Sequence, residues 1–225
     1  KVRGGSTMYE GHVTPGTGKG FNSYELDADG YTRRYTFTTD ATSTDYAINF
    51  EFNKAMKMYL ADFKVYKTDD TTQTSVLPIS ANPNALITNV DTKRTPGEFG
   101  WDGDYPTLAK YNEAKTEMTY GNSSGTFYTI ALMDYDAENV FVPATPEEEP
   151  KMIYVNSVTT QSGKVLGMLA KNLETNTKYT ISFKCKVEEG KFENKDTDTV
   201  YLRVRKDKVR GGSTMYEGHV TPGTG

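Results

Sequence analysis

The sequence predicts an all-β fold, an antiparallel β-sandwich of the jelly-roll type with at most one short helix. Three observations support this prediction. Apolar and polar residues alternate with a period of two along several segments, as in strands with one buried and one wet face. Tyr occurs 16 times and Thr is frequent, and both residue types favour strands. Turn pairs such as Asp29-Gly30 and Glu189-Gly190 separate the alternating segments.

The strands and their buried faces follow from this alternation. One lone cysteine, Cys185, cannot form an intramolecular disulfide, and we expect it to be a small buried residue. The one passable helix spans 107–118. The expected strands lie within 31–37, 46–53, 59–65, 127–132, 152–158, 179–187 and 200–205. The aromatic residues expected in the core are Tyr35, Phe37, Phe50, Phe63 and Phe183.

Length and charge narrow the function classes. A chain of 225 residues forms one large β domain or two small ones. The net charge of −4 argues against a nucleic-acid partner, which needs clustered Lys and Arg. No segment approaches the roughly 18 apolar residues of a membrane span. No Ser-His-acid grouping, zinc spacing or phosphate loop is recognisable, so we expect no enzyme; a glycosidase using paired carboxylates ranks last.

The two ends of the chain carry the same 18 residues. Residues 1–18 and 208–225 both read KVRGGSTMYEGHVTPGTG. The two histidines, His12 and His219, occupy the same position in the two copies of the repeat. This argues against a metal site built from two histidines. The repeat reflects either a tandem array with a period near 207 or an engineered overlap. A fold with one slot for the segment leaves one copy loose, or places it in a neighbouring chain by strand exchange.

Two segments carry a family resemblance. Residues 173–187, LETNTKYTISFKCKV, resemble the "L-x-P-(N/G)-T-x-Y-T-x-S-F-x-x-K" segment of carbohydrate-binding modules of the family 4/9 type. Residues 31–67 resemble the closing strands of those modules, and 59–65 takes the place of their last strand. The resemblance implies a jelly-roll module that binds a polysaccharide or oligosaccharide. It also implies a secreted or cell-surface bacterial protein, with an extracellular location.

The family order is permuted in this chain. Residues 1–67 correspond to the closing strands, 68–83 form a linker-like connection, and 84–207 correspond to the opening strands. The whole chain is then one module in permuted order, followed by the repeated segment. Members of the family often hold a structural calcium, so the resemblance makes Asp62 a candidate ligand. Lys93 stands where the family has an acid, and calcium requires six to eight oxygen ligands. The alternative for Asp62 is a surface aspartate with no special role.

Candidate ligand-binding residues follow from the chemistry of sugars, which present apolar C–H faces and hydroxyls to aromatic rings and polar groups. Trp101 and Tyr105 lie in a run crowded with glycines and acids, and Tyr9, Tyr24 and Tyr111 lie in loops or at element ends. Packing on the core is the alternative for each. The expected ligand is a plant polysaccharide such as starch, xylan or glucan. The alternative function is a structural repeat of a surface fibre or adhesin, acting as a spacer or protein-binding unit.

Overall fold

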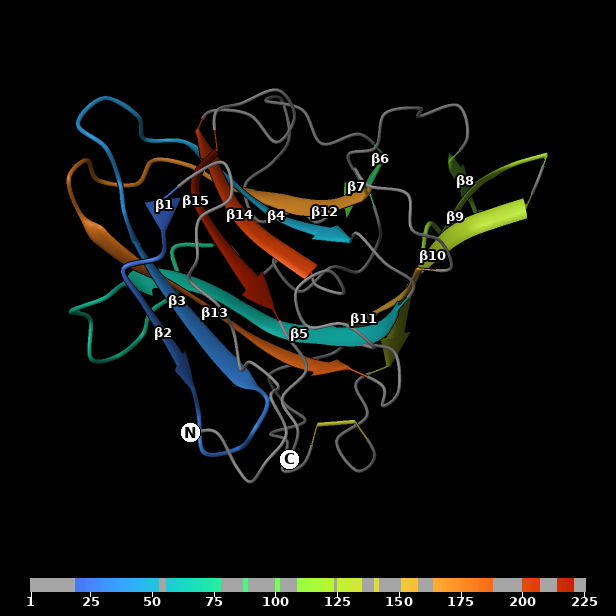
Figure 1. The fold of residues 1–225 in the computed structure, drawn as a ribbon, viewed down its shortest axis with the longest axis horizontal. Coiled ribbons are helices and arrows are strands. Elements are labelled where there is room, and N and C mark those ends of the chain that lie inside the picture. Colours follow the sequence, from blue (N-terminus) through green and yellow to red (C-terminus); the bar gives the residue numbers. More distant parts are fainter. Residues whose placement is uncertain are drawn as a thin grey trace.

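The computed structural model of the chain describes an all-β molecule. The described residues are 19–52, 56–77, 87–88, 100–101, 109–123, 125–134, 140–141, 151–157, 164–187, 200–206 and 214–220. These residues form fifteen strands in two sheets, and none of them lies in a helix. The two sheets pack face to face around one hydrophobic core (Figure 1), which confirms the predicted β-sandwich.

The smaller sheet has seven strands in the order β1-β15-β14-β4-β12-β7-β6. Its pairs are antiparallel except β1 with β15 and β6 with β7. Its strands are β1 (Lys19–Gly20), β4 (Tyr46–Phe52), β6 (Ile87–Thr88), β7 (Gly100–Trp101), β12 (Lys164–Ala170), β14 (Val200–Lys206) and β15 (Thr214–Val220).

The larger sheet has eight strands in the order β2-β3-β13-β5-β11-β10-β9-β8, and all its pairs are antiparallel. Its strands are β2 (Ser23–Leu26), β3 (Thr32–Thr38), β5 (Met56–Lys67), β8 (Ala109–Tyr111), β9 (Glu117–Asn122), β10 (Gly125–Asp134), β11 (Lys151–Ser157) and β13 (Lys178–Val187).

Inward-facing aromatic rings from both sheets fill the core. The five aromatics expected there are all buried, and Cys185 is 1% exposed, as predicted. Strands from distant parts of the chain share this core. β4 lies between β12 and β14, and β5 lies between β11 and β13, so the segments before 68 and after 84 interleave in both sheets.

A bulge in β5 changes which of its residues face the core. Asp62 has a φ of 52°, and the pairing with β13 shifts register beside it. Strict alternation predicts Tyr59 and Ala61 on the same face as Phe63. Instead Leu60 joins the main core, while Tyr59 and Ala61 pack in a second cluster around Phe141. The extra residue at the bulge explains the difference, because it reverses the alternation before it.

The predicted helix at 107–118 is wrong. The chain forms β8 and β9 there, joined by a turn and paired antiparallel. The Asn112 side chain stabilises the turn, since its Oδ1 accepts the backbone N–H groups of Thr116 and Glu117 at 2.8 and 3.0 Å. Lys115 adopts a φ of 54°, which no helix allows. Strand pairing and local side-chain bonding therefore outweigh the weak helical periodicity.

The first part of the linker-like segment is folded against β5. Val76 N–H donates to the carbonyl of Val65, and Ser75 Oγ accepts the Val65 N–H. Leu77 is buried in the core. Residues 68–77 are thus a folded loop and not a free connection, and 78–83 lie outside the described residues.

Candidate functional site: a polar pocket on the larger sheet

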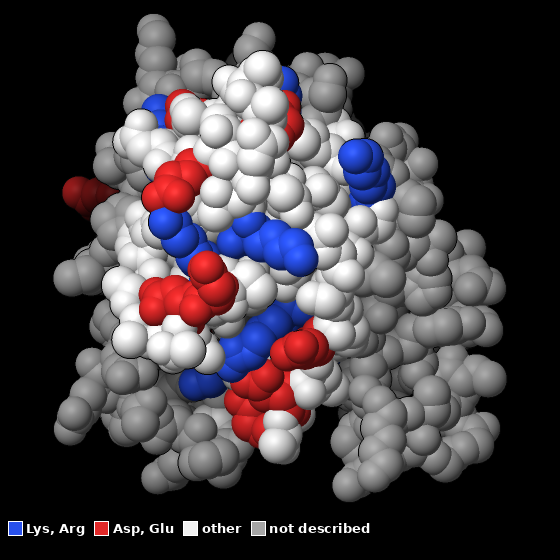
Figure 2. Space-filling view, turned by 90° about the vertical axis from the view of Figure 1, so that its left-hand side faces the viewer, with Lys and Arg blue, Asp and Glu red and all other residues white. Residues whose placement is uncertain are grey.

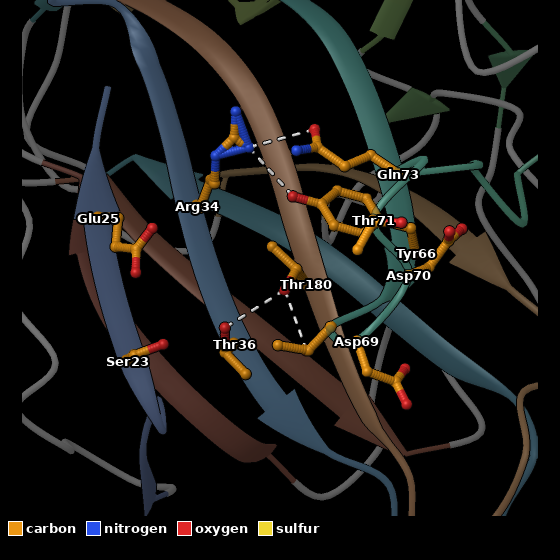
Figure 3. A pocket seen from close by; sticks show the side chains of 11 residues that line it. Ser23, Glu25, Arg34, Thr36, Tyr66, Asp69, Asp70, Thr71, Gln73 and Thr180 are labelled. Atoms are coloured by element: carbon orange, nitrogen blue, oxygen red, sulfur yellow. Dashed lines mark hydrogen bonds between the residues drawn. The ribbon is translucent and has the colours of Figure 1, made fainter. Parts of the chain in front are cut away.

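An open pocket of about 310 Å³ lies on the outer face of the larger sheet, at the end carrying β2, β3, β13 and β5. The loop that follows β5 closes one side of it (Figure 3). Most of its lining side chains are polar, and none belongs to His or Cys. The lining consists of Ser23, Glu25, Arg34, Thr36, Tyr66, Thr68, Asp69, Asp70, Thr71, Gln73 and Thr180.

Strand alternation places these side chains together. On β3, Tyr35 and Phe37 face the core, so Arg34 and Thr36 point outward. The register then sets Ser23 and Thr180 on either side of Thr36, and Glu25 opposite Arg34. Because β2, β3 and β13 are consecutive in the sheet, their outward residues form one continuous polar surface.

Threonine hydroxyls form the floor of the pocket. Thr180 Oγ1 lies 3.4 Å from Thr36 Oγ1 and 3.0 Å from Thr68 Oγ1, so the three hydroxyls form a chain of hydrogen bonds (Figure 3). A hydroxyl has one donor and two acceptor sites. Thr68 at the end of this row is exposed, whereas Thr36 and Thr180 are 7% and 4% exposed, so a ligand hydroxyl reaches the row chiefly at Thr68.

Arg34 fixes the other end of the pocket. Its Nε donates to Asp27 Oδ1 at 3.0 Å, and its Nη2 forms an ion pair with Oδ2 of the same carboxylate. Its Nη1 donates to Tyr66 Oη at 3.1 Å and to Gln73 Oε1 at 3.5 Å. The side chains of Arg34, Tyr66 and Gln73 converge in Figure 3. A guanidinium held at several points is a rigid donor, as recognition of a defined ligand requires.

Electrostatic effects differ among the acids near the pocket. Burial raises the pKa of Asp27, Arg34 opposes this effect, and the neighbouring carboxylates of Asp29 and Glu25 add to it. Hydrogen bonds from the Thr72 hydroxyl and from the Thr72 and Thr74 N–H groups lower the pKa of Asp70. Asp70 is thus an ionised acceptor at neutral pH. On the face shown in Figure 2, Lys and Arg side chains lie beside Asp and Glu side chains.

The aromatic residues predicted to bind ligand do not meet in this pocket. Tyr24 is on β2 but faces inward, where its ring centroid lies 4.9 Å from that of Tyr35. Tyr111 packs against the core from β8. Trp101 belongs to β7 of the other sheet, next to Leu166 of β12. Tyr24 and Tyr111 therefore have the core-packing role that was the alternative for each.

Two of the predicted binding residues, Tyr9 and Tyr105, lie outside the described residues. The duplicate of Tyr9 is Tyr216 in β15, which is described. Tyr216 is 7% exposed and stacks on Phe21, with 5.9 Å between the ring centroids. In the second copy of the repeat this tyrosine is thus a core residue.

Asp62, the candidate calcium ligand, lies among cations. Its Oδ1 is 3.6 Å from Lys64 Nζ, and its Oδ2 is 3.9 Å from Lys184 Nζ. Among the described residues, no three acids, histidines or cysteines are grouped so that they could hold a metal ion. The two ammonium groups supply the charge that a cation would otherwise supply, so the surroundings of Asp62 do not fit calcium.

Sequence reasoning missed the residues that form this pocket. A signal was present, because Arg34 and Thr36 are the polar partners of the core residues Tyr35 and Phe37 within one alternating strand. What alternation does not reveal is that β3 neighbours β13 and that the loop after β5 folds beside them. The loop aromatics are the more conspicuous binding candidates in the sequence, because sugar sites often use exposed rings.

Comparison of the chain with family models, with characterised proteins and with solved structures gives no match. The described part of the chain contains no helix of the length and apolar character needed to cross a membrane.

Proposed function

We propose that the chain is a non-catalytic carbohydrate-binding module that holds a polysaccharide or oligosaccharide at the pocket of Arg34, Thr36 and Thr180. The observation that carries this proposal is the lining itself. Hydroxyl, amide, guanidinium and carboxylate groups meet on one rigid sheet surface. This mixture matches the alternating donors and acceptors of a sugar ring. The resemblance of 173–187 to family 4/9 modules supports the same function, together with a secreted or cell-surface setting and a plant glycan such as starch, xylan or glucan.

The lining also predicts the strength of binding. Among the described residues that line the pocket, Tyr66 is the one aromatic residue, and it is 4% exposed, so it offers little flat surface for a sugar ring to stack on. Hydrogen bonds to solvated groups contribute little net free energy, because each replaces a bond to water. We therefore expect a dissociation constant of about 1 mM for a short oligosaccharide, which corresponds to about −4 kcal/mol.

Affinity electrophoresis with starch, xylan, mixed-linkage glucan and cellulose tests the proposal. Thr36→Val removes one pocket hydroxyl while keeping the shape of the side chain. Thr38→Val makes the same change two residues along the same face of β3, outside the lining. We expect one polysaccharide to retard the native chain and Thr38→Val, and to retard Thr36→Val less.

Two outcomes contradict the proposal at different levels. If none of the four polysaccharides retards the native chain, carbohydrate binding is wrong for these ligands. If retardation persists in Thr36→Val but disappears in Trp101→Ala, the chain binds glycan at β7 of the smaller sheet and not at this pocket.

A second candidate function is a repeat unit of a surface fibre or adhesin, joined to its neighbours by strand exchange. It is favoured because β15 comes from the repeated segment and is paired within the smaller sheet. Sedimentation of the native chain over a wide concentration range tests this function. Concentration-dependent dimers or longer chains support it, and a strict monomer argues against it.

A further inference from the structure

β15 is held firmly on one side and weakly on the other. It pairs with β14 along six positions, from Val200↔Val220 to Arg205↔Thr214. Its other neighbour, β1, contributes the two residues Lys19 and Gly20. Only the two-residue β1 separates β15 from the edge of the sheet. A strand that replaces β15 must therefore restore the six pairs with β14 and the short pairing with β1.

The position between β14 and β1, here called the slot, favours a particular strand through side-chain contacts as well as backbone pairing. Tyr216 and Val220 enter the core, where Tyr216 packs on Phe21 and Phe37. On the opposite face the Glu217 carboxylate, fully buried, accepts a hydrogen bond from Nε of Arg203.

Arg203 also forms an ion pair with Glu51, and so does Arg205. Glu217 therefore completes a group of two acids and two arginines. A buried charge without its partner is strongly unfavourable. The slot therefore requires an acid at this position of the incoming strand.

Residues 1–18 meet every one of these requirements. Tyr9, Glu10 and Val13 stand at the positions of Tyr216, Glu217 and Val220, and all flanking residues are the same. The contacts available to the first copy of the repeat are thus those that the second copy makes.

The short segment between the first copy of the repeat and β1 determines whether residues 1–18 can enter the slot of their own chain. If 1–18 took the slot of its own chain, five residues, 14–18, would join it to β1. β1 lies parallel to the slot strand, and adjacent parallel strands need a crossover of about a dozen residues or more. The first copy therefore does not enter its own slot while β1 keeps its pairing.

We propose that the slot between β14 and β1 accepts residues 1–18 of a second copy of this chain in place of β15. This inference rests on the second candidate function and names its partner and its recognition residues. The native chain carries its own β15 at an effective concentration of about 1 mM, as for a short tether. Exchange in the native chain therefore needs concentrations near or above that value.

Charge reversal in one copy of the repeat tests the proposal. Glu217→Lys places a cation beside Arg203 and weakens the chain's own β15, while the first copy remains intact. Glu10→Lys is the matched control, with the same substitution in the same sequence context. In sedimentation at about 0.1 mM, well below the effective concentration of the tether, we expect Glu217→Lys to reach at least the mass of a dimer. Glu10→Lys and the double variant stay monomeric.

A peptide of the 18 residues provides a second measurement if Glu217→Lys folds poorly. Excess native peptide raises the melting temperature of this variant and dissociates its assemblies, whereas the peptide carrying the Glu10→Lys change does neither. The milder variant Glu217→Gln is treated in the same way.

Three results overturn the proposal. A monomeric Glu217→Lys chain with native stability shows that the chain's own first copy fills the slot. If Glu217→Lys is monomeric and destabilised, and the peptide does not raise its melting temperature, the slot binds no strand from solution. Assembly of the double variant shows that another surface joins the molecules. If Glu217→Lys assembles but the native chain is monomeric at every concentration, the slot is as proposed while the fibre function fails.

Discussion

The rings of Tyr35 on β3 and Phe183 on β13 lie parallel, with 5.9 Å between their centroids and 2° between their planes. Phe183 also meets Phe50 edge-on at 5.1 Å and stacks on Phe63 at 5.7 Å. Phe50 belongs to the smaller sheet and the other three belong to the larger one. Phe183 therefore joins the two sheets at the centre of the core.

Removing this ring should destabilise the whole sandwich. Truncation of a fully buried Phe to Ala costs about 3–5 kcal/mol through lost transfer free energy and the cavity left behind. We expect Phe183→Ala to lower the free energy of unfolding in urea by that amount. Met133→Ala, at a 40% exposed position on β10, serves as the control, with a change within about 0.5 kcal/mol. A loss below about 1 kcal/mol for Phe183→Ala would contradict this description of the core.

Cys185 should report global unfolding. Its side chain is buried on β13, and burial raises the pKa of its thiol, so the reactive thiolate is scarce in the folded chain. We expect a thiol reagent at pH 8 to label the native chain far more slowly than the unfolded chain. The labelling rate should rise in urea in parallel with the loss of β-sheet circular dichroism. Fast labelling without urea is incompatible with the buried position.

Asp40 should stabilise the fold at neutral pH and lose this effect in acid. A hydrogen bond from the Lys206 ammonium, with help from the Ser43 and Thr42 N–H groups, lowers the pKa of Asp40 below its ordinary value of 3.8. A carboxyl whose pKa is lowered by folding stabilises the protein above its ordinary pKa. That stabilisation is lost as the pH falls through the ordinary value towards the lower folded one. Asp40→Asn should therefore be less stable than the native chain at pH 7, with the difference shrinking steadily as the pH falls below 3.8.

Glu113→Gln is the matched control for this measurement, because it removes one negative charge from an exposed turn. Urea denaturation at several pH values gives the comparison. A pH-independent difference between Asp40→Asn and the native chain would show that the Asp40 charge does not act in this way.

Asp27 should matter more for the pocket than for the fold. Burial raises its pKa, so its ionised form is less favourable in the folded chain than in the unfolded one. The native chain therefore gains stability as the pH falls through the raised pKa towards 3.8, and Asp27→Asn lacks this gain. The Arg34 and Asp27 side chains are 20% and 31% exposed, so at pH 7 we expect the free energy of unfolding of Asp27→Asn to lie within about 1 kcal/mol of the native value.

The same variant releases Arg34 Nε and Nη2 from their carboxylate partner. We therefore expect weaker retardation in the polysaccharide gel without a matching loss of stability. Strong destabilisation at pH 7 would show instead that the Asp27–Arg34 pair is chiefly a structural element.

The sequence pattern located most of the long strands but few of the short ones. Period-two alternation located β3, β4, β5, β13 and β14 to within a few residues, and the further strand candidates 127–132 and 152–158 correspond to β10 and β11. Alternation missed β12, which is a run of apolar residues interrupted by Gly167 and lies between β4 and β7. It also missed β15, where Gly218 lies between Glu217 and His219. Strands such as β8 owe their existence to pairing with a neighbour, and no local pattern encodes that.

The sequence by itself determined the all-β class, the aromatic core and the burial of Cys185, because each follows from which residues alternate along a strand. It also showed that one segment is present twice. Only the tertiary structure decided which strands are neighbours, and with them the pocket of Arg34, Thr36 and Thr180 and the setting of Glu217 beside Arg203. Alternation fixes which way a side chain points, whereas sheet order and register fix what it meets, and these depend on contacts between residues far apart in the chain.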